Sequence, residues 1–268
     1  MKGGKRVALL EIKNIDVSYG KHVTVSGCSI DLEQGEICSV VGESGSGKTT
    51  VIRAVLGLLP GGGRVSSGDI IYDGRSLLQL NKKEWRALRG HDISMIFQDS
   101  GAMMNQTRLI GKSFVEYIRT HEHISKQDAW KKGADMLSRM RLPDPDRIMR
   151  SYPFQLSGGM RQRVGIAMGM TYQPKLLLAD EPTSALDVTT QAQIVRQMME
   201  LRDEYGTSII VVTHDIGVAA YMANKVVVMK DGHIEDQGER GYILNDSTNA
   251  YTRKLIGAVP SLGGKRYV

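Results

Sequence analysis

The segment Gly42–Thr49 reads GESGSGKT and joins a glycine-rich turn to a lysine and a threonine. Glycines leave room for backbone N–H groups to converge on phosphate oxygens, which Cβ atoms would obstruct. Lys48 would add a mobile positive charge, and the Thr49 hydroxyl is suited to bind Mg²⁺. A chance match is the alternative, but a predicted buried strand and a predicted helix flank the segment, as the pattern requires. The predicted nucleotide-binding residues are Gly42, Glu43, Ser44, Gly45, Ser46, Gly47, Lys48, Thr49 and Thr50.

Two adjacent carboxylates end the apolar run LLLADE at Leu176–Glu181. Side chains at the ends of strands in an open α/β sheet face the ligand crevice. We therefore interpret Asp180 as a Mg²⁺ ligand and Glu181 as the residue that orients or deprotonates an attacking water. A solvated acidic turn before Pro182 is the alternative, which the phosphate loop in the same chain argues against.

Three further polar or aromatic residues stand at or near the ends of predicted strands. Gln98 follows Ile93–Phe97, where its amide could touch Mg²⁺ or the water. His214 follows Ser208–Thr213 and could reach a γ-phosphate, and Tyr19 could stack on an adenine ring. Taken singly, each is explained as well by structural hydrogen bonding or packing.

A second candidate anion site is Leu156–Met160, which reads LSGGM and opens a predicted helix. Ser157 is a natural N-cap residue, and Gly158 and Gly159 would expose the first N–H groups of the helix. A second site is useful if it serves a nucleotide held by another subunit. An ordinary capped helix is the plainer explanation of these residues alone.

The elements that must position these residues follow from hydrophobic periodicity. Strands alternate with helices on either side of a helical stretch from about 100 to 156, where Ser125 and Asp128 resemble a capping box. The expected elements are short strands over 7–40, a buried strand at Ile37–Val41, a helix at Thr49–Leu59, a hairpin over Ser67–Leu77, strands at Lys175–Ala179, Ser208–Thr213 and Val226–Met229, and a helix at Val188–Tyr205. This order predicts an α/β fold whose mainly parallel sheet is interrupted by a helical insert.

Composition narrows the class of protein. The chain has 268 residues, 41% hydrophobic and 24% charged, enough for a core in one large domain or two small ones. No apolar run approaches the roughly 18 residues needed to cross a bilayer. The two cysteines, Cys28 and Cys38, match neither a disulfide scaffold nor a metal cluster. The formal net charge of +6 suits nucleic acid, an anionic membrane surface or an anionic ligand.

In their order along the chain, the motifs resemble the ATP-binding subunit of an ATP-binding cassette (ABC) transporter, over about residues 10–260. By this resemblance Gly42–Thr49 is Walker A, Leu156–Met160 the signature and Leu176–Glu181 Walker B. Ser184, Ala185, Leu186 and Asp187 form the D-loop. The resemblance implies catalysis by Glu181, His214 and Gln98, adenine stacking by Tyr19, and Mg²⁺ held by Thr49, Gln98 and Asp180. It also implies a head-to-tail dimer, in which Ser157, Gly158, Gly159 and Met160 act on ATP bound by the partner.

The implied fold is a P-loop NTPase cassette of the α/β class, with an antiparallel β subdomain and an inserted helical subdomain. The expected segments are 7–98 for the first part of the ATP-binding core with the β subdomain and 99–160 for the helical subdomain. They continue with 161–236 for the second part of the core and 237–268 for a C-terminal tail.

A narrower resemblance is to the peptide and nickel import group of the family. It rests on YPFQ at Tyr152–Gln155, on TSALDVTTQAQ at Thr183–Gln193 and on YTRKL at Tyr251–Leu255. The group usually has prolines where this chain has Ser100 and Gln106. Many members also carry a cysteine-bearing C-terminal extension; no cysteine follows Pro260 here, so we expect no iron–sulfur cluster.

The group implies ATP and Mg²⁺ as cofactors and import of a solute: a peptide first, a nickel or other metal chelate as the alternative. The implied partners are a second homologous ATPase, giving a heterodimer, two membrane permease subunits and, indirectly, an extracellular solute-binding protein. We expect a peripheral protein on the cytoplasmic face of the cell membrane. Residues 100–160 hold ten Lys and Arg against six Asp and Glu, which suits an anionic leaflet.

Two other classes of function compete with this interpretation. A soluble ABC ATPase acting on nucleic acid or ribosomes would usually show a long coiled-coil insert or two cassettes, and this chain shows neither. A small-molecule phosphotransferase would leave the signature unexplained. We therefore expect an ATPase coupled to transmembrane transport, with no nucleic acid partner.

Overall fold

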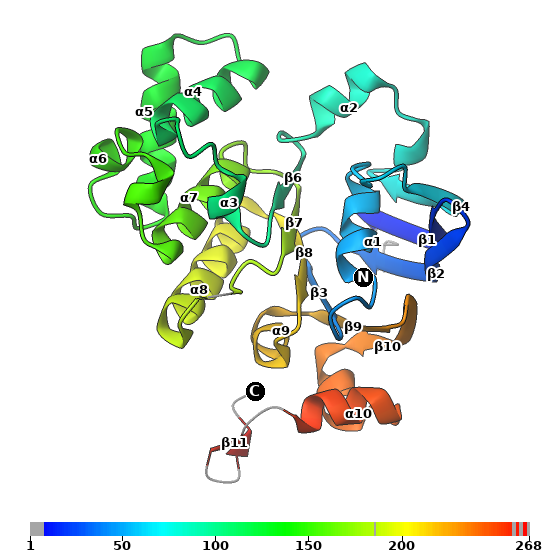
Figure 1. Ribbon diagram of the computed structural model, residues 1–268. Helices are drawn as coiled ribbons and strands as arrows, with labels where there is room; N and C mark the ends of the chain where they lie inside the picture. Colours follow the sequence, from blue (N-terminus) through cyan, green and yellow to red (C-terminus); the bar gives the residue numbers. More distant parts are fainter. Residues whose placement is uncertain (1–7, 185, 259–260, 263–264, 267–268) are drawn as a thin grey trace, which may run out of the picture. The chain divides into compact units, whose positions relative to one another are not determined.

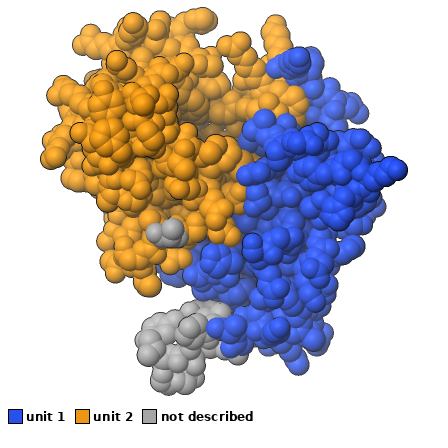
Figure 2. Space-filling view, in the orientation of Figure 1, with its two compact units in different colours: residues 1–82, 206–268 blue, residues 83–205 orange. Residues whose placement is uncertain are grey.

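The computed structural model describes residues 8–184, 186–258, 261–262 and 265–266. Its elements group into two units, one of residues 1–82 and 206–268 and one of residues 83–205, coloured separately in Figure 2. These two units have other boundaries than the four segments expected from the sequence. The four segments therefore stay a prediction. No helix among the described residues is both long enough and apolar enough to span a membrane.

An antiparallel sheet in the first unit has the strand order β2-β1-β4-β5. Its strands are β1 Leu10–Tyr19, β2 His22–Leu32, β4 Arg64–Tyr72 and β5 Arg75–Ser76. Asp73 and Gly74 join β4 to β5 with φ of 46° and 77°, the positive values that a tight hairpin turn needs. The predicted hairpin is thereby confirmed.

A second set of strands in this unit is mainly parallel. β3 Ile37–Val41 pairs in parallel with β8 Ser208–Thr213 and β9 Lys225–Lys230, and β10 His233–Glu239 adds antiparallel to β9. Every residue of β3 and β8 is buried. A strand that is covered on both faces has a nearly continuous apolar sequence rather than an alternating one, and both strands show this pattern. The predicted strands at Ile37–Val41 and Ser208–Thr213 are confirmed to the residue.

Helices and short elements complete the first unit (Figure 1). They are α1 Lys48–Val55, the 3₁₀ turn η1 Leu77–Gln79, α9 Ile216–Met222, the π-helical turn η3 Tyr242–Asp246 and α10 Ala250–Gly257, followed by the strands β11 Ser261–Leu262 and β12 Lys265–Arg266. The helix predicted over Thr49–Leu59 ends early, at Val55. Gly57 has φ of 63°, and the Leu58 N–H donates to the Arg53 carbonyl at 2.9 Å, which is a Schellman cap.

The second unit places a parallel strand pair beside a group of helices. The strands are β6 Ile93–Ile96 and β7 Leu176–Asp180. The helices are α2 Lys82–Leu88, which begins at the boundary of the units, α3 Ser100–Met103, α4 Ile110–His121, α5 Lys126–Arg139, α6 Pro145–Met149, the 3₁₀ turn η2 Pro153–Gln155, α7 Gly158–Met170 and α8 Val188–Tyr205. The α/β class and the predicted helix Val188–Tyr205 are confirmed.

At the start of α5 the structure shows the N-cap bond of the predicted capping box, and a bond between the two side chains in place of the reciprocal bond from the Ser125 N–H. The Ser125 hydroxyl accepts a hydrogen bond from the Asp128 N–H at 3.1 Å and donates to the Asp128 carboxylate at 2.7 Å. The first bond occupies a backbone N–H that the first turn of a helix leaves without an intrahelical partner. Together the two bonds fix the start of α5.

Two histidines close together in the sequence, His121 and His123, have different surroundings in the structure. His123 is exposed, but His121 is partly buried among the rings of Tyr117 and Tyr172, whose centroids lie 5.4 Å and 5.1 Å from it. The residue that makes this cluster possible, Tyr172, lies far along the chain, so helical spacing alone could not reveal it.

Both cysteines have buried thiol groups. Cys28 and Cys38 are free and buried, and their burial raises the pKa of each thiol to about 12. A thiol held in its neutral form is a poor nucleophile and a poor metal ligand. Both cysteines therefore serve as small apolar residues of the core.

Close contact between α4 and α5 depends on glycine, and this yields a stability prediction. A Cβ at Gly111 would lie 2.3 Å from Cζ3 of Trp130 and 2.6 Å from the Met149 carbonyl oxygen. We expect Gly111→Ala to lower the free energy of unfolding by about 1–3 kcal/mol, because the helices would have to separate. Thermal or urea unfolding measures this loss.

The matched control is Gly257→Ala, in the last turn of α10, where a Cβ would meet nothing within 4 Å. Alanine there should leave stability unchanged or raise it by up to about 1 kcal/mol. Equal midpoints for Gly111→Ala and the natural chain would contradict the tight packing of α4 on Trp130.

Candidate functional site

The phosphate loop lies between β3 and α1, where the sequence predicts it. Gly42 has φ of 152°, and a Cβ there would lie 2.1 Å from the Met229 carbonyl oxygen. Gly47 has φ of 98°, and its Cβ would lie 2.9 Å from a methyl group of Val25. Both positions therefore require glycine for conformation and for space, as a cradle for phosphate oxygens does.

The ammonium group of Lys48 lies inside this loop. It donates to the carbonyl oxygens of Gly42 and Glu43 at 2.8 Å and 2.7 Å, and to the Ser46 hydroxyl at 3.4 Å. Lys48 is only 5% exposed, so its charge needs these carbonyls as partners. The loop thus holds a positive charge among backbone groups of fixed direction.

His214 lies at the same edge of the sheet as the start of the phosphate loop. Thr213, the last residue of β8, pairs with Val41, the last residue of β3, so His214 and Gly42 are the next residues on neighbouring parallel strands. Asp215 then caps α9 by accepting from the Gly217 N–H at 2.7 Å. This cap sets where α9 begins, and His214, between the strand and the helix, is exposed.

The second unit brings Gln98 and Glu181 together. β6 and β7 are parallel neighbours, so the residues that follow them leave the same edge, and the Gln98 amide donates to a carboxylate oxygen of Glu181 at 3.2 Å. Glu181 has φ of 45°, unusual for a residue with a side chain. The Ser184 hydroxyl donates to the Glu181 carbonyl at 3.0 Å and supports this turn. An amide is thus positioned to orient the carboxylate proposed as the base.

In the segment after Gln98, two side chains form hydrogen bonds to backbone carbonyls. They are Ser100 and Gln106, which stand where the import group usually has prolines. The Ser100 hydroxyl donates to the Phe97 carbonyl at 3.3 Å. The Gln106 amide donates to the carbonyls of Gly101 and Met104 at 2.6 Å and 3.2 Å. A Cβ at Gly165 would lie 2.4 Å from the Ser100 hydroxyl, so α3 also needs a glycine on α7.

The predicted signature is the N-terminus of α7. Ser157 caps the helix, and its side chain accepts from the Met160 N–H at 3.3 Å. A Cβ at Gly159 would lie 2.6 Å from a methyl group of Thr190, at the start of α8. Glycine at this position therefore permits the signature to pack against the segment that follows the D-loop.

Asp187, in the predicted D-loop, caps α8. Its carboxylate accepts from the Thr190 N–H at 2.9 Å and from the Thr190 hydroxyl at 2.7 Å, and these bonds lower the pKa of Asp187. Leu186 lies next to Gly158, since a Cβ built on Gly158 would be 3.8 Å from a methyl group of Leu186. Ala185, the remaining aliphatic D-loop residue, lies outside the described residues.

Oxygen donors suited to Mg²⁺ are present in both units. Thr49 offers a hydroxyl at the start of α1, and Asp180, 2% exposed, offers a carboxylate at the end of β7. Mg²⁺ is usually bound by one or two such groups together with phosphate oxygens and water. The chemistry of these donors fits the metal, and the residue roles stay predictions.

Tyr19 lies at the end of β1, where its ring packs on the backbone of Gly63; a Cβ there would lie 2.5 Å from the ring. Adenine stacking by this ring stays a prediction. A residue that motif reasoning gave no role is Tyr251, whose hydroxyl contacts the phosphate loop. The sequence offered no signal for that contact, because it joins residues 208 positions apart.

The loop, the paired strand ends and the capped signature define an ATP-binding cassette. The family model described as ABC transporter matches residues 25–184. The chain belongs to the ABC transporter family, and it is an ATPase of that family. The resemblance inferred from the motifs is confirmed.

Curated relatives carry names from peptide transport. The chain is 42% identical over 259 residues to the oligopeptide transport ATP-binding protein OppD of Bacillus subtilis, covering 95% of this chain and 72% of that protein. It is 42% identical over the same length to the dipeptide transport ATP-binding protein DppD of Bacillus subtilis, covering 95% and 77%.

Solved structures agree with the fold. CbiO1 from Clostridium perfringens, part of the ABC transporter complex cbiONQ, superimposes with a TM-score of 0.77 at 25% identity, over 89% of this chain and 91% of that one. The ATP-binding cassette MJ0796, a dimer bound to ADP and Pi in a post-hydrolysis state, gives 0.76 at 27% identity, over 86% and 98%. The cassette fold is thereby confirmed.

The phosphate loop yields a prediction that separates two effects of replacing a glycine: collision of the new Cβ with neighbouring atoms, and strain from a positive φ. Gly42→Ala should abolish ATP binding in an equilibrium assay with fluorescent nucleotide, since its Cβ would collide with the Met229 carbonyl and displace the loop. Gly45→Ala is the matched comparison: φ there is also positive, at 83°, but a Cβ would meet nothing within 4 Å. We expect it to weaken binding by about tenfold, the cost of backbone strain alone. Equal affinities for the two variants would refute the role of the Met229 contact.

Proposed function

We propose that this ATPase powers the import of a solute, a di- or oligopeptide, through a membrane permease. It works as a head-to-tail dimer that holds each ATP between the Walker A loop of one subunit and the signature of the other. The observation that supports the dimer is the N-terminus of α7, where Ser157 and two glycines present backbone N–H groups beside the D-loop. The chain carries its own phosphate loop elsewhere, so this second anion site suits a nucleotide held by a partner.

In the proposed cycle, Glu181 orients and deprotonates the water that attacks the γ-phosphate. The Gln98 amide, 3.2 Å from the Glu181 carboxylate, holds that carboxylate in the required direction. Lys48 and the loop N–H groups bind the phosphates, and His214 contacts the γ-phosphate. Thr49, Asp180 and Gln98 would hold Mg²⁺, which would supply neutralisation of the phosphate charge.

The assembly follows the pattern that the import group implies. We propose a heterodimer with a homologous ATPase, attached to two permease subunits on the cytoplasmic face of the membrane and supplied by an extracellular solute-binding protein. The peptide-transport names of the curated relatives support peptides as the transported solute. A nickel or other metal chelate stays the alternative, and no particular observation favours it.

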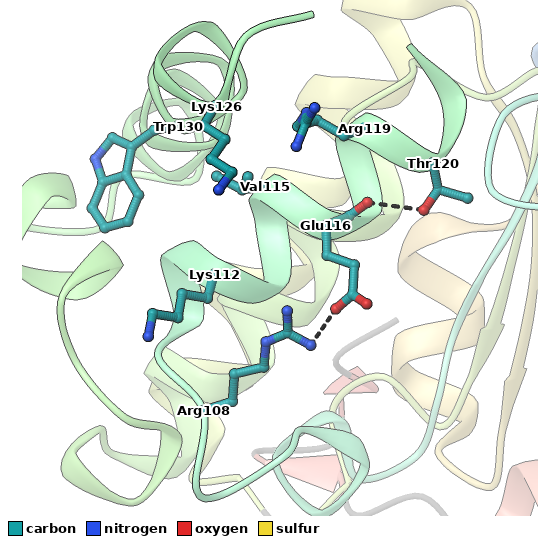
Figure 3. A pocket seen from close by; sticks show the side chains of 8 residues that line it. All are labelled: Arg108, Lys112, Val115, Glu116, Arg119, Thr120, Lys126 and Trp130. Carbon is teal, nitrogen blue, oxygen red and sulfur yellow. Dashed lines mark hydrogen bonds and ion pairs between the residues drawn. The ribbon is translucent and has the colours of Figure 1, made fainter. Parts of the chain in front are cut away.

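A basic groove on the helical part of the second unit supports attachment to the permease. It is a pocket of about 630 Å³ along α4 and α5 (Figure 3). The residues that matter are Arg108, Lys112, Glu116, Arg119, Lys126 and Trp130.

The charge of this groove is largely uncompensated. Arg108 pairs with Glu116, whereas within the described part of the chain Lys112, Arg119 and Lys126 make no ion pair with a carboxylate. Arg119 instead donates to the Ile124 carbonyl at 3.1 Å. A groove with three such cations beside an indole ring is complementary to an acidic segment, and we propose that the occupant is a cytoplasmic loop of the permease.

The proposed catalytic role gives one prediction. Glu181→Gln should still bind ATP but hydrolyse it at least about 100-fold more slowly, because the general base is removed while the shape of the side chain is kept. Phosphate release measures turnover, and size-exclusion chromatography with ATP and the partner ATPase should show a stable dimer.

The matched control is Glu200→Gln on α8, where the carboxylate forms an exposed ion pair with Arg141. Its turnover should equal that of the natural chain. If Glu181→Gln hydrolyses ATP at the normal rate, Glu181 is not the base; if it never dimerises with ATP, the sandwich arrangement is wrong.

The groove gives a second prediction, tested with the permease subunits encoded beside this chain. Reversing two charges, Lys112→Glu with Lys126→Glu, should weaken co-purification with the permease by about tenfold or more, while ATP binding by the isolated subunit is kept. The control is Lys82→Glu with Lys131→Glu, two exposed lysines outside the groove, which changes net charge equally.

Normal assembly by the groove variant would exclude this surface as the permease contact. Loss of binding to phosphatidylglycerol vesicles with normal assembly would assign the groove to the lipid surface instead.

A further inference from the structure

A hydroxyl group from the C-terminal helix contacts the phosphate loop. The backbone N–H of Glu43 donates to the hydroxyl oxygen of Tyr251 at 3.4 Å. Both residues belong to the first unit. No motif of the ATPase cycle described above includes Tyr251, so this contact needs an explanation of its own.

The contact fixes one particular peptide unit of the loop. The N–H of Glu43 and the carbonyl of Gly42 belong to the same peptide, and in a trans peptide they point in opposite directions. Tyr251 accepts from the N–H side, and the Lys48 ammonium donates to the carbonyl side at 2.8 Å. The peptide plane is therefore held from both sides, and a rotation that frees one bond also breaks the other.

The phenol ring is itself held in place. Tyr251 packs with Leu244 and Leu255 against a buried core cluster that contains Val41, the residue directly before the loop. The ammonium of Lys230 lies 5.2 Å from the centroid of the ring, within reach of a cation–π interaction. These contacts restrict the position of the ring and hence of its hydroxyl.

The helix that carries Tyr251 is attached to β10 by side-chain hydrogen bonds. Asn249 caps α10 by accepting from the N–H groups of Tyr251 and Thr252 at 2.9 Å and 3.0 Å, and its amide donates to the Glu235 carbonyl at 3.0 Å. The buried Thr252 hydroxyl donates to the Asp236 carboxylate at 3.1 Å. The start of α10 is thus fixed relative to the sheet.

The same core cluster connects α10 to the helix after His214. Ile216, Ala219 and Ala223 of the α9 region are buried against Ile243 and Ile256. A displacement of α10 would therefore disturb both the phosphate loop and α9, the element that follows His214.

We propose that Tyr251 is a positioning residue of the ATP site: its hydroxyl fixes the Gly42–Glu43 peptide and thereby the Lys48 ammonium that binds the phosphates. The C-terminal segment Tyr242–Gly257 is then part of the nucleotide-binding machinery rather than a tail. The role rests on the ATPase activity of the chain and not on its permease or transported solute.

The variant that tests this role is Tyr251→Phe in the full chain, which removes the hydroxyl and keeps the ring, its packing and the contact with Lys230. We expect a roughly three- to tenfold loss of affinity for a fluorescent ATP analogue and a matching rise in KM, the range for one lost hydrogen bond. The rate at saturating ATP should stay close to normal. Hydrogen–deuterium exchange of peptides covering residues 42–46 should be faster without nucleotide, because the Glu43 N–H has lost its acceptor.

The matched control is Tyr221→Phe, the same deletion at a tyrosine of α9 that is 55% exposed. It should change neither nucleotide affinity nor exchange in the loop. Normal affinity and normal loop exchange in Tyr251→Phe would overturn the proposal. A lowered melting temperature with ATP affinity unchanged would also overturn it, since Tyr251 would then act in packing alone. A failure of peptide transport would leave this test untouched, because every readout concerns ATP and the isolated subunit.

Discussion

The buried ammonium of Lys48 is the charge around which the nucleotide site is built. A cation so little exposed is stable only with close oxygen partners, and the chain supplies the carbonyls of Gly42 and Glu43. Those carbonyls point inward because Gly42 adopts a conformation that residues with a Cβ avoid. The parallel strand β3 brings the loop to this position, and the burial of β3 on both faces keeps it there.

The second unit solves a different problem, that of holding a carboxylate in a fixed direction. Glu181 follows the buried strand β7 and turns through a left-handed conformation, which the Ser184 hydroxyl supports from the main-chain side. Gln98 reaches the same carboxylate from the neighbouring strand. A strained residue that hydrogen bonds hold in place is characteristic of functional positions, where the energy of folding elsewhere offsets the local cost.

Local patterns in the sequence account for much of this structure, and contacts between distant residues account for the rest. The strand Ser208–Thr213 and the helix Val188–Tyr205 were predictable, because apolar continuity and helical spacing are properties of neighbouring residues. The phosphate loop was predictable because its chemistry lies in one continuous segment. The early end of α1 at Val55, before the cap at Gly57, was not predicted, since Pro60 and the glycines after it offered a more obvious stop. The ring cluster around His121 and the contact of Tyr251 with Glu43 depend on packing between segments far apart in sequence, which no local spacing encodes.

The segment after Gln98 has a thermodynamic consequence of its own. A proline ring restricts φ at every temperature and lowers the entropy of the disordered state. In this chain, hydrogen bonds made by Ser100 and Gln106 order the segment instead of proline rings, so its order is enthalpic in origin. Order of this kind declines as temperature rises. The order of the segment after Gln98 is therefore expected to be more temperature-sensitive than that of the same segment stiffened by prolines.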